Sequence, residues 1–299
     1  SGAGLLLLTV GDQKALSAAV TRADGSEADA SADLATMVVL ANDSSDTKPD
    51  AKTLLPLIRT SLLAAAAPYP AKLTTWTSSP SLFLDGPEVR RGYLIEAESI
   101  TANATLRSGS WPGLVASGSP IPVAVPATAA EALGVQVGST LRLVSDRSGS
   151  RTSTFDIVVS GIFTPAETPI WARDELGGRG YDPNHFRLPT FGPFVVASGT
   201  LESRAARVEQ VIAVLDPSLG GDAAGVPALL QRINGAPEVL QDQAGPTVGQ
   251  VLIRSELGVQ FESWRATLRV TDALIVTVFL LVLALGAATT ALIARVLAD

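Results

Sequence analysis

The stretch "DALIVTVFLLVLALGAATTALIAR", residues 272–295, decides what kind of protein this chain is. The 22 residues between Asp272 and Arg295 carry no charge. A helix of that length reaches about 33 Å, the thickness of the hydrocarbon core of a bilayer. Residues 279–285 offer no polar face, so the helix must be buried all round, in lipid or in a large core. We expect a transmembrane helix over 273–297; the alternative is the central helix of a soluble protein.

The other end of the chain, "SGAGLLLLTVGDQ" (1–13), is also apolar, but only Leu5 to Val10 are strongly so. This run is too short to span a bilayer, and no basic segment precedes it as in a signal peptide. It is either a buried strand or the end of a transmembrane helix that begins earlier. We expect the second, so that 1–10 end a preceding transmembrane helix and 11–272 form a domain between two spans.

The composition excludes several kinds of site. The chain has 299 residues, a formal net charge of -7 and scattered basic residues, so it shows no basic face for nucleic acid. It has no cysteine, which excludes disulfides, thiolate metal sites and cysteine nucleophiles. His185 is the only histidine, so no metal site can be built from several histidines. We predict no nucleic-acid partner, no metal and no cofactor.

The body between the two apolar ends has an α+β pattern that occurs twice. Near its start, a β-rich apolar run is followed by a helical segment and two more strand-like runs, and a similar series returns near its end. The long insertion between the two series predicts a two-lobed domain, with one lobe formed from both ends. The expected strands are 34–41, 72–78, 92–98, 208–215 and 237–241, and the expected helices are 53–67 and 223–235, the second closed by Gly235.

The inserted lobe, about 107–200, is rich in glycine, proline and short β-prone runs. A strand over 121–126 leads into a short helix over 127–134. The runs 139–145 and 154–163 form an antiparallel pair in this interpretation, and 191–198 is a strand at a sheet edge near Pro193, since proline cannot donate to a ladder.

A stalk helix is expected over about 247–272. Its apolar side chains recur at spacings of four, three and four, which places them on one helical face: Leu257, Phe261, Trp264 and Leu268. No proline follows Pro246, so a single helix could run from Val248 to Leu297, about 75 Å long. Such a rod would couple an external domain to the membrane.

Residues of reactive types are present, but the sequence patterns around them favour structural roles. Glu96 and Glu98 lie two apart on an expected strand, so they share a face; acid–base work is possible, but the solvated face of an edge strand is the commoner outcome. The cluster "YDPNH" (181–185) is interpreted as a turn, with weak cation binding as the alternative.

Four tryptophans, Trp76, Trp111, Trp171 and Trp264, are expected to pack rather than to form a ligand cage. No nucleophile elbow and no phosphate loop occur, and "GVQVGST" (134–140) is expected to be a turn entering a strand. We predict no catalytic, cofactor-binding or metal-binding residue, and no enzyme.

One segment carries a family resemblance. "GSWP" (109–112), "PVAVPATAAEALGVQVGSTLRL" (122–143), "VVSGIFTP" (158–165) and "PIW" (169–171) follow one another in the order typical of the extracytoplasmic domain of FtsX/MacB-like ABC transporter permeases of the actinobacterial type. The resemblance implies an extracytoplasmic domain over 11–272 in a multi-pass protein of the cell membrane. It also implies a cytoplasmic ABC ATPase subunit as partner, contact with membrane lipid, and a second permease copy or pseudo-symmetric half. It transfers no catalytic residue.

Three functions remain open from the sequence. The leading hypothesis is a non-catalytic permease segment that couples ATP hydrolysis by a partner to motion of the extracytoplasmic domain, for efflux, lipid or lipoprotein handling, or mechanotransmission. The alternative is a membrane-anchored extracellular binding or sensor domain without an ATPase. The third, an anchored exterior enzyme, is disfavoured because the usual nucleophile and metal constellations are missing.

Overall fold

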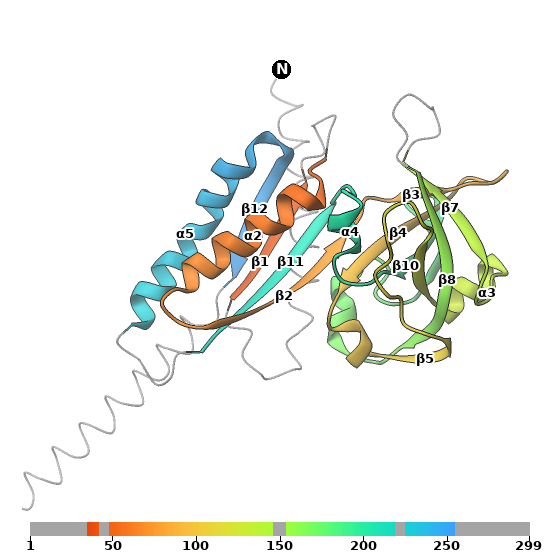
Figure 1. Ribbon diagram of the computed structural model, residues 1–299, viewed down its shortest axis with the longest axis horizontal. Helices are drawn as coiled ribbons and strands as arrows, with labels where there is room; N and C mark the ends of the chain where they lie inside the picture. The colour runs from red at the N-terminus through yellow and green to blue at the C-terminus, as the bar shows by residue number, and fades with distance from the viewer. Residues whose placement is uncertain (1–34, 42–47, 146–153, 219–224, 255–299) are drawn as a thin grey trace, which may run out of the picture. The chain divides into compact units, whose positions relative to one another are not determined.

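A computed structural model describes residues 35–41, 48–145, 154–218 and 225–254 (Figure 1). The expected end of a preceding transmembrane helix (1–10) and the expected transmembrane helix (273–297) lie outside these residues. Within the described ranges, no helix combines the length and the apolar character that a membrane crossing requires.

The described chain is a mixed, sheet-rich α+β structure built on one sheet. The strand order is β12-β1-β11-β2-β4-β3-β7-β8-β6-β10-β9, and β5 pairs with β8 outside this path. The strands are β1 (Ala35–Ala41), β2 (Ala71–Ser78), β3 (Leu82–Leu84), β4 (Arg90–Ala97), β5 (Ala104–Gly109), β6 (Ile121–Pro126), β7 (Thr140–Val144), β8 (Thr154–Pro165), β9 (Tyr181–His185), β10 (Leu188–Val195), β11 (Gln210–Pro217) and β12 (Val248–Arg254).

Strands from both ends of the described chain form one side of this sheet. β1 lies between β11 and β12 and is antiparallel to both, and β11 is antiparallel to β2. Thr36, near the start of β1, lies opposite Arg254, the last residue of β12. The chain therefore enters and leaves this part of the structure on neighbouring strands. We call β12, β1, β11 and β2 the end strands, and the remaining strands the central strands.

Two long helices cover the end strands. Figure 1 shows α2 (Ala51–Ala66) and α5 (Val226–Ala244) side by side over one face of β12, β1 and β11. The Asp50 carboxylate accepts a hydrogen bond from the Thr53 amide at 2.8 Å and caps α2, which ends just before Pro68. The buried residues Leu54, Ile58 and Leu62 give α2 the apolar face that the sequence predicts.

The helix predicted to close at Gly235 continues to Ala244, so the strand predicted over 237–241 is wrong. Gly235 and Pro237 lie inside α5. Leu229, Ile233 and Leu240 are fully buried at helical spacing, and α5 packs on α2 and on β12. Burial of this apolar face outweighs the local cost of glycine and proline within a helix.

The stalk helix predicted over 247–272 is wrong for its first turns. Residues Val248–Arg254 form strand β12, and the remainder of the predicted stalk lies outside the described residues. Val251 and Ile253 are β-branched and alternate along the strand, and they lie opposite Val39 and Met37 of β1. The open edge of β1 therefore decides the conformation of this segment.

The central strands follow the predictions more closely. β7 and β8 form the expected antiparallel pair, and β6 leads directly into α3 (Ala127–Leu133). Gly134 ends α3 with φ of 66°, in the left-handed region that glycine enters without a steric penalty. The turn predicted over 134–140 does enter a strand, β7.

Strand β10 corrects the prediction of an edge strand near Pro193. β10 pairs with β4, β6 and β9, so it lies inside the sheet. Its ladder to β4 shifts register between Phe191 and Phe194. Pro193 falls in this irregularity, where its missing N–H removes no regular ladder bond.

Candidate functional site

The end strands and the central strands meet within the sheet at a short ladder between β2 and β4. Only three residue pairs form it: Trp76 with Ala97, Thr77 with Glu96, and Ser78 with Ile95. Ser79 extends the contact, because its amide donates to the Leu94 carbonyl at 2.9 Å and its hydroxyl accepts from the Leu94 amide at 2.9 Å. We call residues 76–79 and 94–97 the junction. A ladder this short depends on side-chain contacts for its strength.

Aromatic side chains supply much of that strength. The Trp76 ring meets the Trp171 ring edge-on, with centroids 5.9 Å apart and planes at 88°. Trp171 stacks on Phe163 at 6.0 Å, and Phe163 lies 5.6 Å from Trp111. Geometries of this kind add attraction beyond the burial of apolar area. The prediction that the tryptophans pack is thus confirmed for Trp76, Trp111 and Trp171; Trp264 lies outside the described residues.

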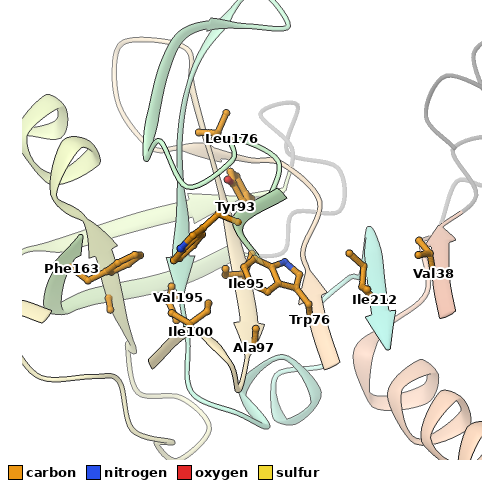
Figure 2. Close-up of a cluster of buried hydrophobic side chains, with 12 residues drawn as sticks. Val38, Trp76, Tyr93, Ile95, Ala97, Ile100, Phe163, Leu176, Val195 and Ile212 are labelled. Atoms are coloured by element: carbon orange, nitrogen blue, oxygen red, sulfur yellow. The ribbon is translucent and has the colours of Figure 1, made fainter. Parts of the chain in front are cut away.

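The same cluster reaches both sets of strands. Figure 2 shows Trp76 between Ile212 and Val38 of the end strands and Ile95 of β4, with Phe163 further into the central strands. Trp76 is 1% exposed, and its indole N–H has no acceptor in the described part of the chain. The Trp76 side chain is therefore held by packing alone, at the point where the two sets of strands join.

Glu96 ties the junction to a neighbouring turn. Its carboxylate accepts hydrogen bonds from the amides of Gly199 at 2.6 Å and Leu201 at 2.9 Å, at the start of the short helix α4 (Thr200–Ser203). Burial raises the pKa of Glu96, and the two amide bonds oppose that effect. Glu98 is exposed and lies beyond the end of β4. The predicted pair of carboxylates on one strand face is wrong, since only Glu96 belongs to the strand.

A buried tyrosine–aspartate pair lies on the central side of the junction. The Tyr93 hydroxyl donates to Asp174 at 2.7 Å, and the other oxygen of Asp174 accepts from the amides of Leu176 at 3.2 Å and Gly178 at 2.8 Å. Burial raises the pKa of Asp174 to about 6 and raises the pKa of Tyr93 well above its ordinary value. Both groups are closed to solvent and satisfied within the fold, so the pair fastens the 174–178 loop to β4.

The "YDPNH" segment forms strand β9 rather than the predicted turn. The turn follows it, at Phe186 and Arg187. His185 Nε2 lies 2.9 Å from a Glu175 oxygen, and Asp182 pairs with Arg179 at 3.4 Å. The segment became a strand because β10 offers it a partner, with Tyr181 opposite Phe191 and their rings stacked at 4.8 Å.

The geometry of these groups suits a structural role better than a chemical one. The carboxylates of half-buried Glu96 and buried Asp174 accept bonds from the chain's own amides and hydroxyl, and each fixes a loop to β4. The sequence did not reveal the Tyr93–Asp174 bond, because its partners lie 81 positions apart. The signal that could have found Asp174 is the pair Gly177 and Gly178 shortly after it, a typical setting for an Asp side chain that bonds the backbone of its own turn.

Comparison with known proteins finds similarity at the level of structure. No known family and no curated protein matches the chain. A domain of a candidate permease protein from Porphyromonas gingivalis is similar, with a TM-score of 0.32 and 13% identity, covering 74% of this chain and 88% of that one. The extracellular domain of the noncanonic ABC-type transporter YknZ from Gram-positive bacteria is also similar, with a TM-score of 0.37 and 13% identity, covering 74% of this chain and 100% of that one.

Proposed function

We propose that this chain is the non-catalytic extracytoplasmic part of an ABC-type permease, together with a transmembrane helix that follows it. In this proposal the domain is two-lobed, with a porter-like lobe formed from both ends of the domain and a β-rich inserted lobe over about 107–200, between transmembrane helices. A cytoplasmic ATPase subunit drives the membrane helices, and the domain converts their movement into work outside the cell. The protein is multi-pass, contacts membrane lipid, and acts with a second permease copy or a pseudo-symmetric half.

The observation that carries the proposal is the position of the two ends of the described domain. Thr36 and Arg254 are direct partners across the β1–β12 ladder, so both connections leave from one place on the sheet. One connection leads back to the apolar 1–10 segment and the other leads on to the uncharged stretch after Asp272. Paired ends of this kind suit a domain inserted between two neighbouring membrane helices.

The path for transmitted motion follows the sheet. A displacement applied at β1 and β12 passes through β11 to β2, because these strands pair over most of their length. It then reaches β4 through the three residue pairs of the junction. The packed aromatic cluster around Trp76 makes this short ladder stiff, since packed interiors transmit strain. The junction is therefore the candidate path by which movement at the chain ends reaches the central strands.

The location of the domain can be tested with single introduced cysteines, because residues 1–299 contain none; cells that carry the unaltered protein provide the blank. Leu114→Cys places a thiol at an exposed position (59%), and Ala213→Cys places one at a fully buried position (0%). In intact cells, a membrane-impermeant maleimide should label Leu114→Cys and leave Ala213→Cys unlabelled. Labelling of Leu114→Cys only after lysis would contradict an extracellular domain.

The partnership with an ATPase requires a separate experiment. The complete natural protein is purified in mild detergent, its co-purifying chains are identified, and ATP hydrolysis is measured. We expect a stoichiometric P-loop ATPase whose activity depends on the permease. A chain that is reproducibly alone and inert toward ATP, while a control transporter stays intact, would favour the alternative of a membrane-anchored sensor or binding domain.

A further inference from the structure

Three strands have a single partner within the part of the chain that the structure describes. They are β12, which pairs with β1, β9, which pairs with β10, and β5, which pairs with β8. The free side of such an edge strand presents backbone N–H and C=O groups to which another chain can add a strand. Proteins usually prevent this pairing with charged residues, proline or a bulge on the edge strand. The three edge strands differ in this protection.

Strands β9 and β5 carry features that discourage pairing with another chain. β9 contains Asp182 and Pro183, and proline has no N–H to donate to a ladder. β5 contains Arg107 in its middle, and its ladder to β8 shifts register between Leu106 and Ser108. A charge, a proline or an irregular ladder thus interrupts each of these two edges.

Strand β12 lacks these features after its first turn of register. The ladder to β1 is irregular between Val248 and Gln250, and it is regular from Gln250 to Arg254. We call residues 250–254 the edge segment. It contains no proline, lysine or carboxylate, and its one charge lies at its last residue. The three apolar side chains in its middle are only half-buried, whereas the β1 residues opposite them are buried. The edge segment is therefore a regular, apolar edge.

The edge segment is symmetric in polarity about its central residue. Its order is Gln250, Val251, Leu252, Ile253 and Arg254. In an antiparallel ladder with a second copy of itself centred on Leu252, Leu252 lies opposite Leu252. Val251 then lies opposite Ile253 on one face, and Gln250 opposite Arg254 on the other. The two neighbouring registers that keep the faces matched would place Leu252 opposite Gln250 or Arg254. Only the central register therefore pairs apolar residues with apolar residues and polar residues with polar residues.

We propose that β12 pairs antiparallel with β12 of a second copy of this chain, about a two-fold axis at Leu252. An interface on a two-fold axis must be self-complementary, and the edge segment meets this condition. The two Arg254 residues then lie about 14 Å apart along the strands, so their like charges are separated. A five-residue ladder is a small contact, but copies held in one membrane meet at a high effective concentration. The choice of a second copy rather than a strand of another protein also rests on the proposed function, which includes a second permease copy.

The test uses single cysteines in the full-length protein in native membranes, with the unaltered protein as the blank. Leu252→Cys places the thiols of two copies directly opposite each other, at a separation that a disulfide spans. Mild oxidation should link two copies of this variant, at least tenfold above two controls, as measured on non-reducing gels and by mass spectrometry. Gln250→Cys controls for register, because its two positions lie about 14 Å apart in the proposed ladder. Val239→Cys, 49% exposed on α5, controls for random collision. Equal linking at the three positions, no linking at Leu252→Cys, or linking to a different protein would overturn the proposal.

A second measurement tests the register through charge. In the Leu252→Cys protein, Gln250→Glu places a carboxylate opposite Arg254 of the second copy, and Gln250→Lys places a like charge there. Cross-strand pairs of opposite charge attract and those of like charge repel, so linking should be at least twofold faster with Glu and at least twofold slower with Lys. Arg254 of the same chain lies about 14 Å from position 250, so the difference reports on the second copy. Equal rates in the two variants would overturn the proposal. Linking does not depend on an ATPase co-purifying, so this proposal and the proposed function can fail separately.

Discussion

The end strands and the central strands bury their apolar side chains in different ways. The end strands bury aliphatic side chains such as Met37, Val211 and Leu215 under two long helices, in a plain layered arrangement. The central strands have only short helices beside them, and they depend on aromatic packing and on buried hydrogen bonds such as Tyr93–Asp174. The end strands are stabilised by buried apolar area spread over many residues, and the central strands by a few specific contacts. Single substitutions should therefore weaken the central strands more.

The largest effect is expected at the junction, which both regions share. Trp76→Ala removes a fully buried indole from between β11 and β4, and should cost about 3–5 kcal/mol of unfolding free energy. Denaturant titration followed by circular dichroism measures this loss. Val239→Ala, at a half-exposed position of α5, is the matched control and should change stability by less than about 0.5 kcal/mol. Comparable losses in the two variants would remove the special role of the junction.

The buried aspartate should make stability depend on pH in the central strands. Burial raises the pKa of Asp174 from 3.8 to about 6, so the native state holds this proton more tightly than the unfolded state. The stabilisation is complete below pH 3.8 and is lost as the pH rises through 6, by roughly 3 kcal/mol. The side chain of the Asp174→Asn variant cannot titrate, so its stability should change less with pH between pH 4 and 7. Thermal unfolding across this range measures the dependence. An identical pH dependence of stability in wild type and variant would show that Asp174 is not its source.

The contact between β4 and α4 should be weaker but measurable. Glu96→Gln keeps one acceptor oxygen in place of two, so one of the amides of Gly199 and Leu201 loses its partner. An unsatisfied amide of this kind costs about 1–3 kcal/mol. Hydrogen exchange at residues 199–203 should accelerate in the variant and stay unchanged in α2. Faster exchange in both places would indicate a global loss of stability instead.

The smallest effects are expected from two glycines and should have opposite signs. Gly134→Ala places a Cβ at φ of 66° after α3, and should destabilise by about 1 kcal/mol although nothing lies within 4 Å. Gly235→Ala fills an open position inside α5, and should stabilise by roughly 0.5–1 kcal/mol. Thermal melts of both variants give the two signs. Equal signs would show that local backbone preference does not control these helix positions.

The sequence predicted the elements whose signal is local. The apolar runs that became β1, β2, β4, β6 and β11 are rich in β-branched and aromatic residues, and α2 and α3 have clear ends at Pro68 and Gly134. The class of fold followed from the order of these runs. Contacts between segments far apart in the sequence were not predictable. Gly235 and Pro237 indicated a helix break, but α5 continues through both residues. Residues 248–254 form β12 because β1 provides a neighbouring strand to pair with.

The candidate site was predicted only in part, for the same reason. The tryptophans were expected to pack, but nothing local indicated that Trp76 and Trp171, far apart in sequence, meet at 5.9 Å. Glu96 was identified as notable, yet its partners at Gly199 and Leu201 lie more than 100 positions away. Contacts formed by tertiary packing produce no regular residue spacing in the sequence, so they cannot be predicted from such spacing.

The adjacency of Thr36 and Arg254 has a consequence for how this domain can be rearranged. Antiparallel partners on neighbouring strands lie about 5 Å apart, so a turn of a few residues is enough to join them. A circular permutant that links residue 254 to residue 35 and opens the chain between β7 and β8 would keep the ladders described above.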